Sequence, residues 1–217
     1  MKLNNVPESL PPARSTYRHG DLRRALLDAG IELARDGGPD AVVLREATRR
    51  AGVVPNAAYR HFGSRQELLW AVREAALAAA AGAMEKELAV LPCDQPPADF
   101  ARAQVRAIGT AYLRFAQAEP GLFRTAFVVS AEGDGQLGPG KAGASGLDPF
   151  QLLGKAIDRL VDAGVLNPAR RPNAEYLAWS SVHGLALLII DGPLRAMPPD
   201  ETHALGQRLI DMVERGL

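Results

Sequence analysis

The sequence has little cysteine and no long apolar run. Its 217 residues include one cysteine, Cys93, which excludes an intramolecular disulfide and any metal site built from several thiolates. The stretch "MKLNNVPESLPPARS" has no apolar core of signal-peptide length. The longest apolar run, "LALLII" at residues 185–190, is far too short to cross a bilayer. We therefore expect a cytoplasmic protein that does not span a membrane.

Net charge is also lacking, because 25 basic residues balance 25 acidic ones. The charges are nevertheless uneven along the chain. Residues 14–65 contain ten arginines against six acidic residues, an excess of four positive charges, and the rest of the chain carries the opposite excess. Such an excess over fifty residues is common by chance, but a basic segment on an acidic body is also typical of a protein that contacts a polyanion.

No segment alternates apolar and polar residues as a half-buried strand does, whereas helical spacing recurs throughout. The sequence therefore predicts an all-α fold of about nine helices. Residues 1–13, with three prolines, are expected to form a loose arm. Residues 14–63 form one predicted domain and residues 64–217 a second. The glycine-rich stretch at residues 132–146 is predicted to be a flexible loop.

The first domain is predicted to hold three helices. The first has apolar residues on one face from Leu22 to Leu33 and ends at the glycine- and proline-containing "DGGPD". The second runs over residues 43–51 and stops at Gly52, and the third begins at Pro55 and reaches about His61. After it, the spacing S-x-x-E at residues 64–67 predicts a capping box for a long, alanine-rich fourth helix.

The second domain is predicted to continue with five more helices. A fifth contains Ile108 and ends at Pro120, a short sixth follows, and a seventh contains Leu153. An eighth, over about residues 173–190, is apolar nearly all round and should therefore be buried on all sides. The ninth closes the chain with an aligned apolar stripe at residues 205, 209 and 212.

The second and third predicted helices have the properties of a helix-turn-helix motif. Small or apolar residues stand where the two helices would cross, and Gly52 can turn the chain without strain. The helix after the turn carries Asn56 and Arg60, side chains that can bind adenine and guanine edges. A helical hairpin with a polar face remains the alternative, since such patterns are common.

A longer stretch is more specific. "YRHGDLRRALLDAGIELARDGG" followed by "LREATRRAGVVPNAAYRHFGSRQELL" resembles the N-terminal DNA-binding domain of TetR-family repressors over residues 17–70. The later "YLAWSSVHGLALLIIDGPL" is similar to the C-terminal regulatory domain of one branch of that family, the WHG type. These resemblances imply a dimeric transcriptional repressor that binds a palindromic operator and is released by a small molecule.

The resemblance also implies roles for individual residues. Base edges would be contacted by Asn56, Ala57 and Arg60, and the groove edge by Arg45. The implied DNA-binding set is Arg45, Pro55, Asn56, Ala57, Tyr59, Arg60, His61 and Arg65, in which Tyr59, His61 and Arg65 would bind phosphate. Arg14 and Arg18 would reach the backbone from the arm. Two positions depart from the family pattern: Val54 stands where a serine or threonine cap is usual, and Ala47-Thr48 where a bulky aliphatic precedes alanine.

In the second domain the resemblance implies a small-molecule pocket and a dimer interface through the eighth and ninth helices. The candidate pocket residues are Trp70, Leu113, Phe115, Phe123, Phe127, Phe150, Trp179 and His183, and the effector would be small and apolar or amphipathic. Any of these side chains can equally be plain core, and a buried His183 should have a hydrogen-bond partner. Ligand binding would tilt the fourth helix and move the DNA-binding domains out of register.

Two other functions are alternatives to DNA binding. An enzyme is not favoured, because the sequence has no phosphate-binding loop, metal-binding histidine pair or nucleophile elbow, and no cofactor is predicted. Ser180 and His183 could share a helix face, but no acidic residue lies near them in the sequence. The second alternative, an interaction module that keeps the helix-turn-helix shape without binding DNA, is opposed by the arginines of the motif.

Overall fold

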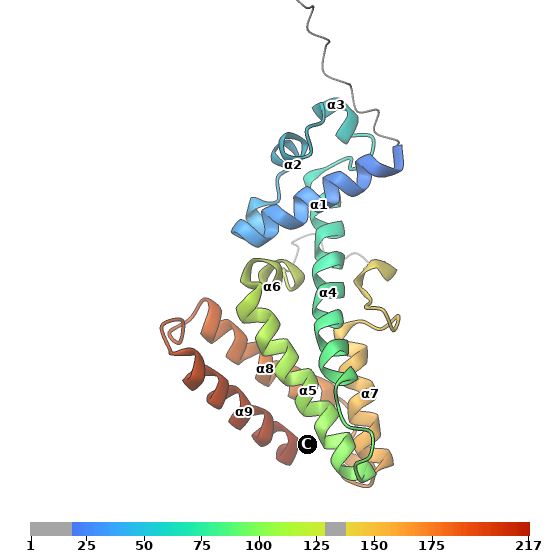
Figure 1. Cartoon of the computed structure of the whole chain (residues 1–217), viewed down its shortest axis with the longest axis vertical. Helices are drawn as coiled ribbons and strands as arrows, with labels where there is room; N and C mark the ends of the chain where they lie inside the picture. Colours follow the sequence, from blue (N-terminus) through green and yellow to red (C-terminus); the bar gives the residue numbers. More distant parts are fainter. Residues whose placement is uncertain (1–18, 129–137) are drawn as a thin grey trace, which may run out of the picture.

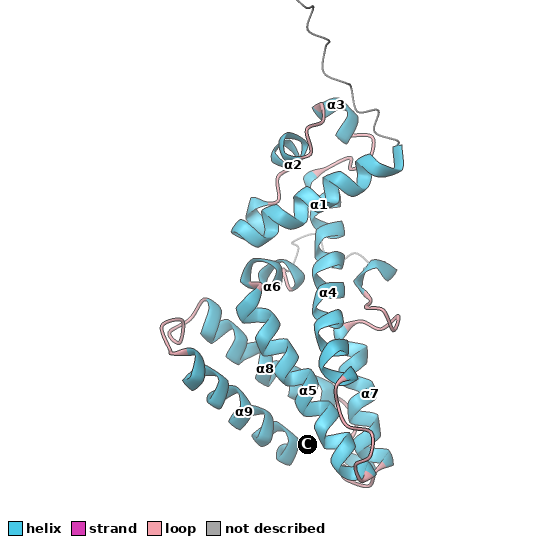
Figure 2. Ribbon diagram, viewed as in Figure 1, coloured by secondary structure: helices cyan, strands magenta, loops and turns pink. Residues whose placement is uncertain are grey.

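The computed structural model describes residues 19–128 and 138–217. The predicted arm, with Arg14 and Arg18, and residues 132–137 of the predicted loop lie outside these ranges. Figure 2 shows helices and loops and no strand in this part of the chain, which confirms the all-α fold. The two ranges contain nine α-helices and three short 3-10 helices. None of these helices is both long and apolar enough to cross a membrane.

Three helices form a unit at one end of the molecule (Figure 1). They are α1 (His19–Gly37), α2 (Leu44–Arg50) and α3 (Pro55–Ala58), with the 3-10 helix η1 (Pro39–Ala41) between the first two. Their inward side chains, among them Leu26, Ala47 and Ala58, are fully buried. We call residues 19–63 the head and residues 65–217 the body.

The third helix is shorter than the sequence predicts. It ends at Ala58 instead of about His61, and residues 59–61 form a turn. The amides of His61 and Phe62 both donate to the Ala58 carbonyl, at 2.9 and 3.0 Å. This turn brings the Phe62 ring into the core of the head, where it is almost fully buried. Burial of an aromatic ring thus outweighs one more turn of regular helix.

The long helix α4 (Arg65–Ala89) joins the head to the body (Figure 1). Its N-terminus is capped by Ser64, whose hydroxyl accepts a hydrogen bond from the Glu67 amide at 3.1 Å. The reciprocal half of the predicted capping box differs, because the Glu67 carboxylate accepts from the Gly63 amide. The cap still satisfies amides that the helix itself leaves unpaired.

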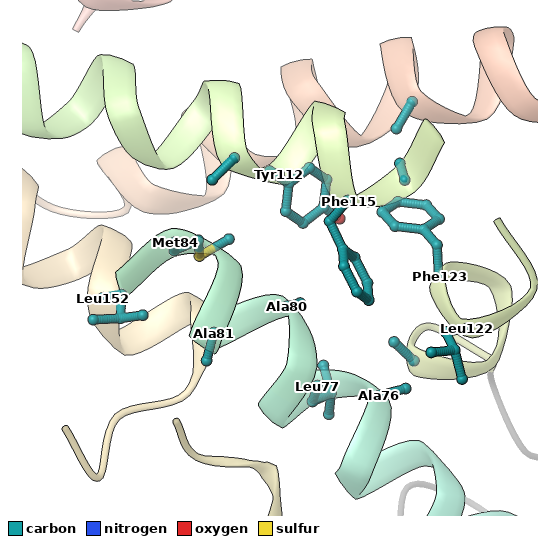
Figure 3. Close-up of a cluster of buried hydrophobic side chains, with 14 of the residues drawn as sticks. Ala76, Leu77, Ala80, Ala81, Met84, Tyr112, Phe115, Leu122, Phe123 and Leu152 are labelled. Atoms are coloured by element: carbon teal, nitrogen blue, oxygen red, sulfur yellow. The ribbon is translucent and has the colours of Figure 1, made fainter. Parts of the chain in front are cut away.

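Five further helices complete the body: α5 (Pro97–Ala118), α6 (Pro120–Ala126), α7 (Pro149–Asp162), α8 (Ala174–Ile190) and α9 (Pro199–Gly216). A short 3-10 helix, η3 (Pro168–Arg170), lies between α7 and α8. Figure 3 shows the core between α4 and its neighbours, where Leu77 and Met84 of α4 face Tyr112 of α5 and Phe123 of α6. The alanines of α4 are small enough to let these helices pack closely on it.

The packing shows which faces of α8 and α9 the rest of the chain covers, and it corrects the predicted stripe of α9. In the single chain the rest of the protein covers only part of α8, because Leu177, Leu187 and Leu188 are exposed; burial of these side chains by a partner subunit stays a prediction. The inward face of α9 contains Gly206 and Ile210, whereas Met212, the last residue of the predicted stripe, is 61% exposed. The periodicity identified both helices, but it could not tell which apolar face the rest of the chain covers.

The glycine-rich segment has local structure over residues 138–146. It contains the 3-10 helix η2 (Pro139–Lys141), and two carboxylates of α4 hold its backbone. Glu74 accepts from the Gly138 amide, and Glu85 accepts from the amides of Ala144 and Ser145 at 3.0 and 2.8 Å. The hydrogen bonds from Ser145 lower the pKa of Glu85 below its ordinary value.

Candidate functional site

The turn between α2 and α3 has the geometry of a helix-turn-helix. Gly52 has a φ of 66°, a left-handed conformation that costs glycine little and other residues more. No atom lies within 4 Å of the place where a Cβ would sit, so the backbone angle rather than space favours glycine here. The Val53 amide donates to the Thr48 carbonyl at 3.0 Å and closes the turn.

Thr48, where the family pattern has alanine, is accommodated inside the head. Its side chain is buried, and its hydroxyl donates to the Arg45 carbonyl at 2.6 Å. A buried hydroxyl with a partner carries little penalty. The departure from the pattern therefore leaves no unsatisfied group under α2.

Most arginines of the head are neutralised within the protein. Arg49 pairs with Glu46 at 2.6 Å, and its hydrogen bond lowers the pKa of that carboxyl. Arg50 donates to Asp36 at 2.7 Å and lies 3.9 Å from Glu32. The other paired arginines are Arg24, with Asp28, and Arg35, with Glu119.

Three arginines of the head have no ion pair with a described residue. One of them, Arg23, lies over the Phe62 ring, with its Cζ 4.9 Å from the ring centroid. The other two, Arg45 on α2 and Arg60 just after α3, are exposed, and neither guanidinium has an ion pair or hydrogen bond with any residue in the ranges that the structure describes. An unpaired guanidinium in water retains all five of its donors for an external acceptor. The α2–α3 surface therefore carries two guanidinium groups that the described residues leave without a partner.

The remaining predicted DNA-binding residues lie on or beside this surface. Asn56 is exposed and Tyr59 is 58% exposed, while Ala57 and His61 are half-buried. Pro55 begins α3 as predicted, although its side chain lies outside the described part. The fold brings the set together at the end of the molecule remote from α9 (Figure 1).

Arg65 differs from the rest of the set because it binds the head itself. Its Nε donates to the Val42 carbonyl at 2.9 Å and a terminal nitrogen donates to the Pro39 carbonyl at 2.8 Å. Asp40 lies 3.9 Å away. Its side chain is still 44% exposed, so one face of the guanidinium remains available to solvent while the other fixes η1 against the start of α4.

Helix α6 connects the head to the deeper part of the body. A Cβ on Gly121 would lie only 2.1 Å from the Ala34 carbonyl oxygen, so glycine is required where α6 crosses the end of α1. Glu119 pairs with Arg35 of α1 at 3.1 Å. At its other end, Arg124 forms a forked pair with Asp191 just after α8. The head therefore contacts α6 through the close backbone approach at Gly121 and through the ion pair of Arg35 with Glu119.

The body contains a cavity of about 270 Å³. Side chains of α4 to α9 and of the residue 141–150 region form its wall, and most of that wall is apolar. Of the eight residues predicted for a pocket, Phe127, Phe150 and Trp179 line it. The other five do not line it: Trp70, Leu113, Phe115, Phe123 and His183. Trp70 instead lies under the Arg73 guanidinium, 4.9 Å from ring centroid to Cζ.

A hydrogen-bonded group links the cavity wall to His183. The Trp179 indole donates to the Tyr112 hydroxyl at 3.0 Å, and that hydroxyl lies 2.7 Å from Nδ1 of His183. Burial raises the pKa of Tyr112 and lowers the pKa of His183 below 6.5. Because the indole can only donate, full satisfaction of the group has the neutral phenol donate to an unprotonated Nδ1. His183 thus has the partner that its burial called for.

The sequence reading missed the polar residues of the cavity wall. Tyr112, Arg73 and the ion pair of Lys141 with Asp148, at 2.9 Å, all contribute to it. A hydroxyl at a buried position of α5 was the available signal for Tyr112. Arg73, whose Nε donates to the Ala126 carbonyl at 3.0 Å, gave none, since its partner lies 53 residues away.

The contacts of Ser180 and His183 give no support to the alternative of an enzyme. The hydroxyl of Ser180 donates to the Leu177 carbonyl at 3.1 Å, and Nδ1 of His183 is bound to Tyr112. The serine is therefore engaged within its own helix rather than with the imidazole, which gives no support to a serine–histidine pair.

Comparison with known proteins assigns both parts of the chain. Residues 26–72 match the family of bacterial regulatory proteins described as the tetR family. Residues 105–213, half of the chain, match a tetracyclin repressor-like C-terminal domain. The WHG branch suggested by the sequence is not distinguished by these matches and stays a prediction.

Individual relatives agree with this assignment. A transcriptional regulator of the helix-turn-helix type, BetI from Rhizobium meliloti, is 45% identical over 47 residues, which are 22% of this chain and 23% of that protein. The chain thus matches less than a quarter of the length of this curated relative.

Two solved structures illustrate the likeness of fold. A protein of unknown function from Rhodococcus sp. RHA1 is 27% identical with a TM-score of 0.71, covering 94% of this chain and 99% of that one. A TetR variant from Acinetobacter baumannii, in complex with minocycline, is 19% identical with a TM-score of 0.53 over 88% of this chain and 93% of its own. From the family matches over the head and over half of the chain, together with this geometry, the chain belongs to the TetR family of bacterial transcriptional regulators.

Proposed function

We propose that this regulator represses transcription by binding an operator in duplex DNA through the α2–α3 surface. The observation that carries the proposal is the division among the arginines of the head. Arg49 and Arg50 are neutralised by carboxylates, whereas the exposed guanidinium groups of Arg45 and Arg60 have no partner among the residues of known placement. Asn56 is exposed on the same pair of helices. Phosphates supply general affinity, and arginine and asparagine provide base contacts in the major groove.

The proposed active form is a homodimer in which α8 and α9 of two copies form a four-helix bundle. The exposed apolar strip of α8, Leu177 with Leu187 and Leu188, has no cover in the single chain. Gly184 between them has open space around its Cβ position, which permits close approach of a second helix. A twofold dimer would present its heads to major-groove segments one helical turn, about 34 Å, apart and would prefer a palindromic operator.

The proposed effector is a small apolar or amphipathic molecule in the body cavity. The apolar wall and the few polar groups around it support this ligand chemistry. Helix α4 runs from the capped start at Ser64 past Leu77 and Met84 in the wall, so a ligand that favours another tilt of α4 would move the head. Such a ligand acts only through its different affinity for the two arrangements.

Selection from a pool of random duplexes, performed with and without candidate metabolites, tests the proposal. The wild-type protein is expected to retain palindromic sequences, and an effector should reduce that retention. Changing Arg45→Ala or Arg60→Ala should weaken binding to the retained sequence by about 1–3 kcal/mol and relax base preference.

Arg49→Ala is the matched control, since this guanidinium is already paired with Glu46. It should weaken binding less than either variant and leave base preference unchanged. If the wild-type protein retains no duplex, DNA binding is refuted and an interaction module that only keeps the helix-turn-helix shape becomes the better account. If both arginine variants bind like wild type, the assignment of the base-reading residues is wrong.

A further inference from the structure

Val54 is the most exposed large apolar side chain of the head. It is 69% exposed and lies between the turn at Gly52 and the start of α3. Its neighbour Val53 packs against the core of the head. Val53 is partly buried, whereas Val54 and Asn56, two residues further along, are both exposed.

Nothing in the head explains a valine at this position. A serine or threonine here could accept a hydrogen bond from a free amide of α3, and a valine side chain cannot. Its exposure also leaves most of the side chain in contact with water. A single exposed apolar residue is ordinary on most surfaces, but this one stands beside the exposed polar surface of Arg45, Asn56 and Arg60.

The DNA major groove offers one apolar group among its polar base edges, the C5-methyl of thymine. We propose that Val54 packs against a thymine methyl in each half-site and is a specificity-determining residue of this regulator. The inference rests on the proposed function and adds a base that the polar residues do not read. Removal of that contact exposes apolar surface on both partners without breaking any hydrogen bond.

The test uses the full-length protein and the duplex that it retains from a random pool. Each thymine of that duplex is replaced in turn by deoxyuridine, which removes the methyl group and leaves the pairing edge unchanged. Loss of one buried methyl corresponds to about a fourfold loss of affinity. We expect that loss at one thymine of each half-site for the wild-type protein, and no loss at the same position for Val54→Ala.

Two further variants separate this role from general effects. Val54→Ser adds a possible cap for α3 but removes the methyl groups, so it should lose the discrimination between thymine and deoxyuridine even if overall affinity rises. Val90→Ala removes the same atoms from a valine that is 75% exposed at the end of α4, far from the head in Figure 1, and should keep the wild-type pattern.

The outcomes distinguish the inference from the function on which it rests. Equal affinity of the wild-type protein for every thymine and deoxyuridine duplex overturns the role of Val54 while leaving DNA binding intact. Equal discrimination by wild type and Val54→Ala does the same, because the methyl would then be read by another residue. Failure of the wild-type protein to retain any duplex overturns both.

Discussion

At the level of single residues, partial burial of His183 lowers the pKa of its imidazole. The imidazole lies against the rings of Phe123 and Phe127, with centroid distances of 5.5 and 5.0 Å. Its Nδ1 is bound to the Tyr112 hydroxyl. This setting disfavours the charged form and lowers the pKa of His183 below 6.5. The neutral ring is therefore part of the folded state.

This shift predicts a pH dependence of stability. With a pKa lower in the folded than in the unfolded state, the unfolded chain binds more protons as the pH falls below 6.5, so the free energy of unfolding decreases there. Urea unfolding at a series of pH values should show a smaller decrease for His183→Gln than for the wild-type protein. His203→Gln, at an exposed position of α9, is the control. An identical dependence of unfolding free energy on pH for the wild-type protein and His183→Gln would contradict the prediction.

Arg65 supports a second prediction at this scale. Arg65→Ala removes two hydrogen bonds to the head and one positive charge near the start of α4. We expect weaker binding to all DNA sequences alike and a shallower salt dependence, by about one unit of slope. Arg65→Lys keeps the charge but not the two-pronged geometry, so it should preserve the slope. A change of base preference in Arg65→Ala would argue against this role.

At the scale of elements, α6 decides how the head sits on the body. Its last residue, Ala126, and the following Phe127 line the cavity, and the helix packs against α1 through Gly121. One short helix therefore touches both the ligand cavity and the head. Rigid packing of this kind transmits small shifts because a close-packed contact has little room to absorb them.

The contact at Gly121 can be tested by adding one methyl group. Gly121→Ala would place Cβ 2.1 Å from one backbone carbonyl oxygen of α1 and 2.5 Å from the next, so we expect it to lower the free energy of unfolding by about 1–3 kcal/mol. Gly82→Ala within α4 meets no atom within 4 Å and should instead raise it, by up to about 1 kcal/mol. Chemical denaturation measures both, and equal effects would refute the contact.

At the scale of the whole molecule, the uncovered face of α8 bears on assembly. Leu177 is 63% exposed in the single chain, and water contact with a row of leucines is unfavourable. A second copy of the same surface would remove that contact on both sides, in agreement with the proposed dimer.

Leu177→Glu is expected to prevent dimerisation, because the carboxylate would have to lose its water at the interface. Light scattering should then give the mass of one chain at micromolar concentration, and binding to the palindromic duplex should weaken. Val90→Glu places the same charge on an exposed valine elsewhere and should remain dimeric. A monomeric wild-type protein, or a dimeric Leu177→Glu, would exclude α8 as the interface.

Periodicity and backbone preferences act over a few residues, so the helical class and the turn at Gly52 could be predicted from the sequence alone. The sequence also indicated the surface that we propose binds DNA, since the residues of α2 and α3 are close in the chain. The end of α3 was predicted too late, because the burial of Phe62 in the core of the head, with Arg23 of α1 over its ring, depends on residues distant in the sequence.

Which of these side chains are free to contact DNA depends on how distant helices pack. The partners of Arg50 are carboxylates of α1, and those of Arg35 and Arg124 lie 84 and 67 residues away. Such pairs, like the choice of Phe127 and Trp179 for the cavity wall, arise when distant helices pack together. Local patterns do not encode that packing, so only the folded chain shows that no residue of the ranges 19–128 and 138–217 pairs with the guanidinium of Arg45 or Arg60.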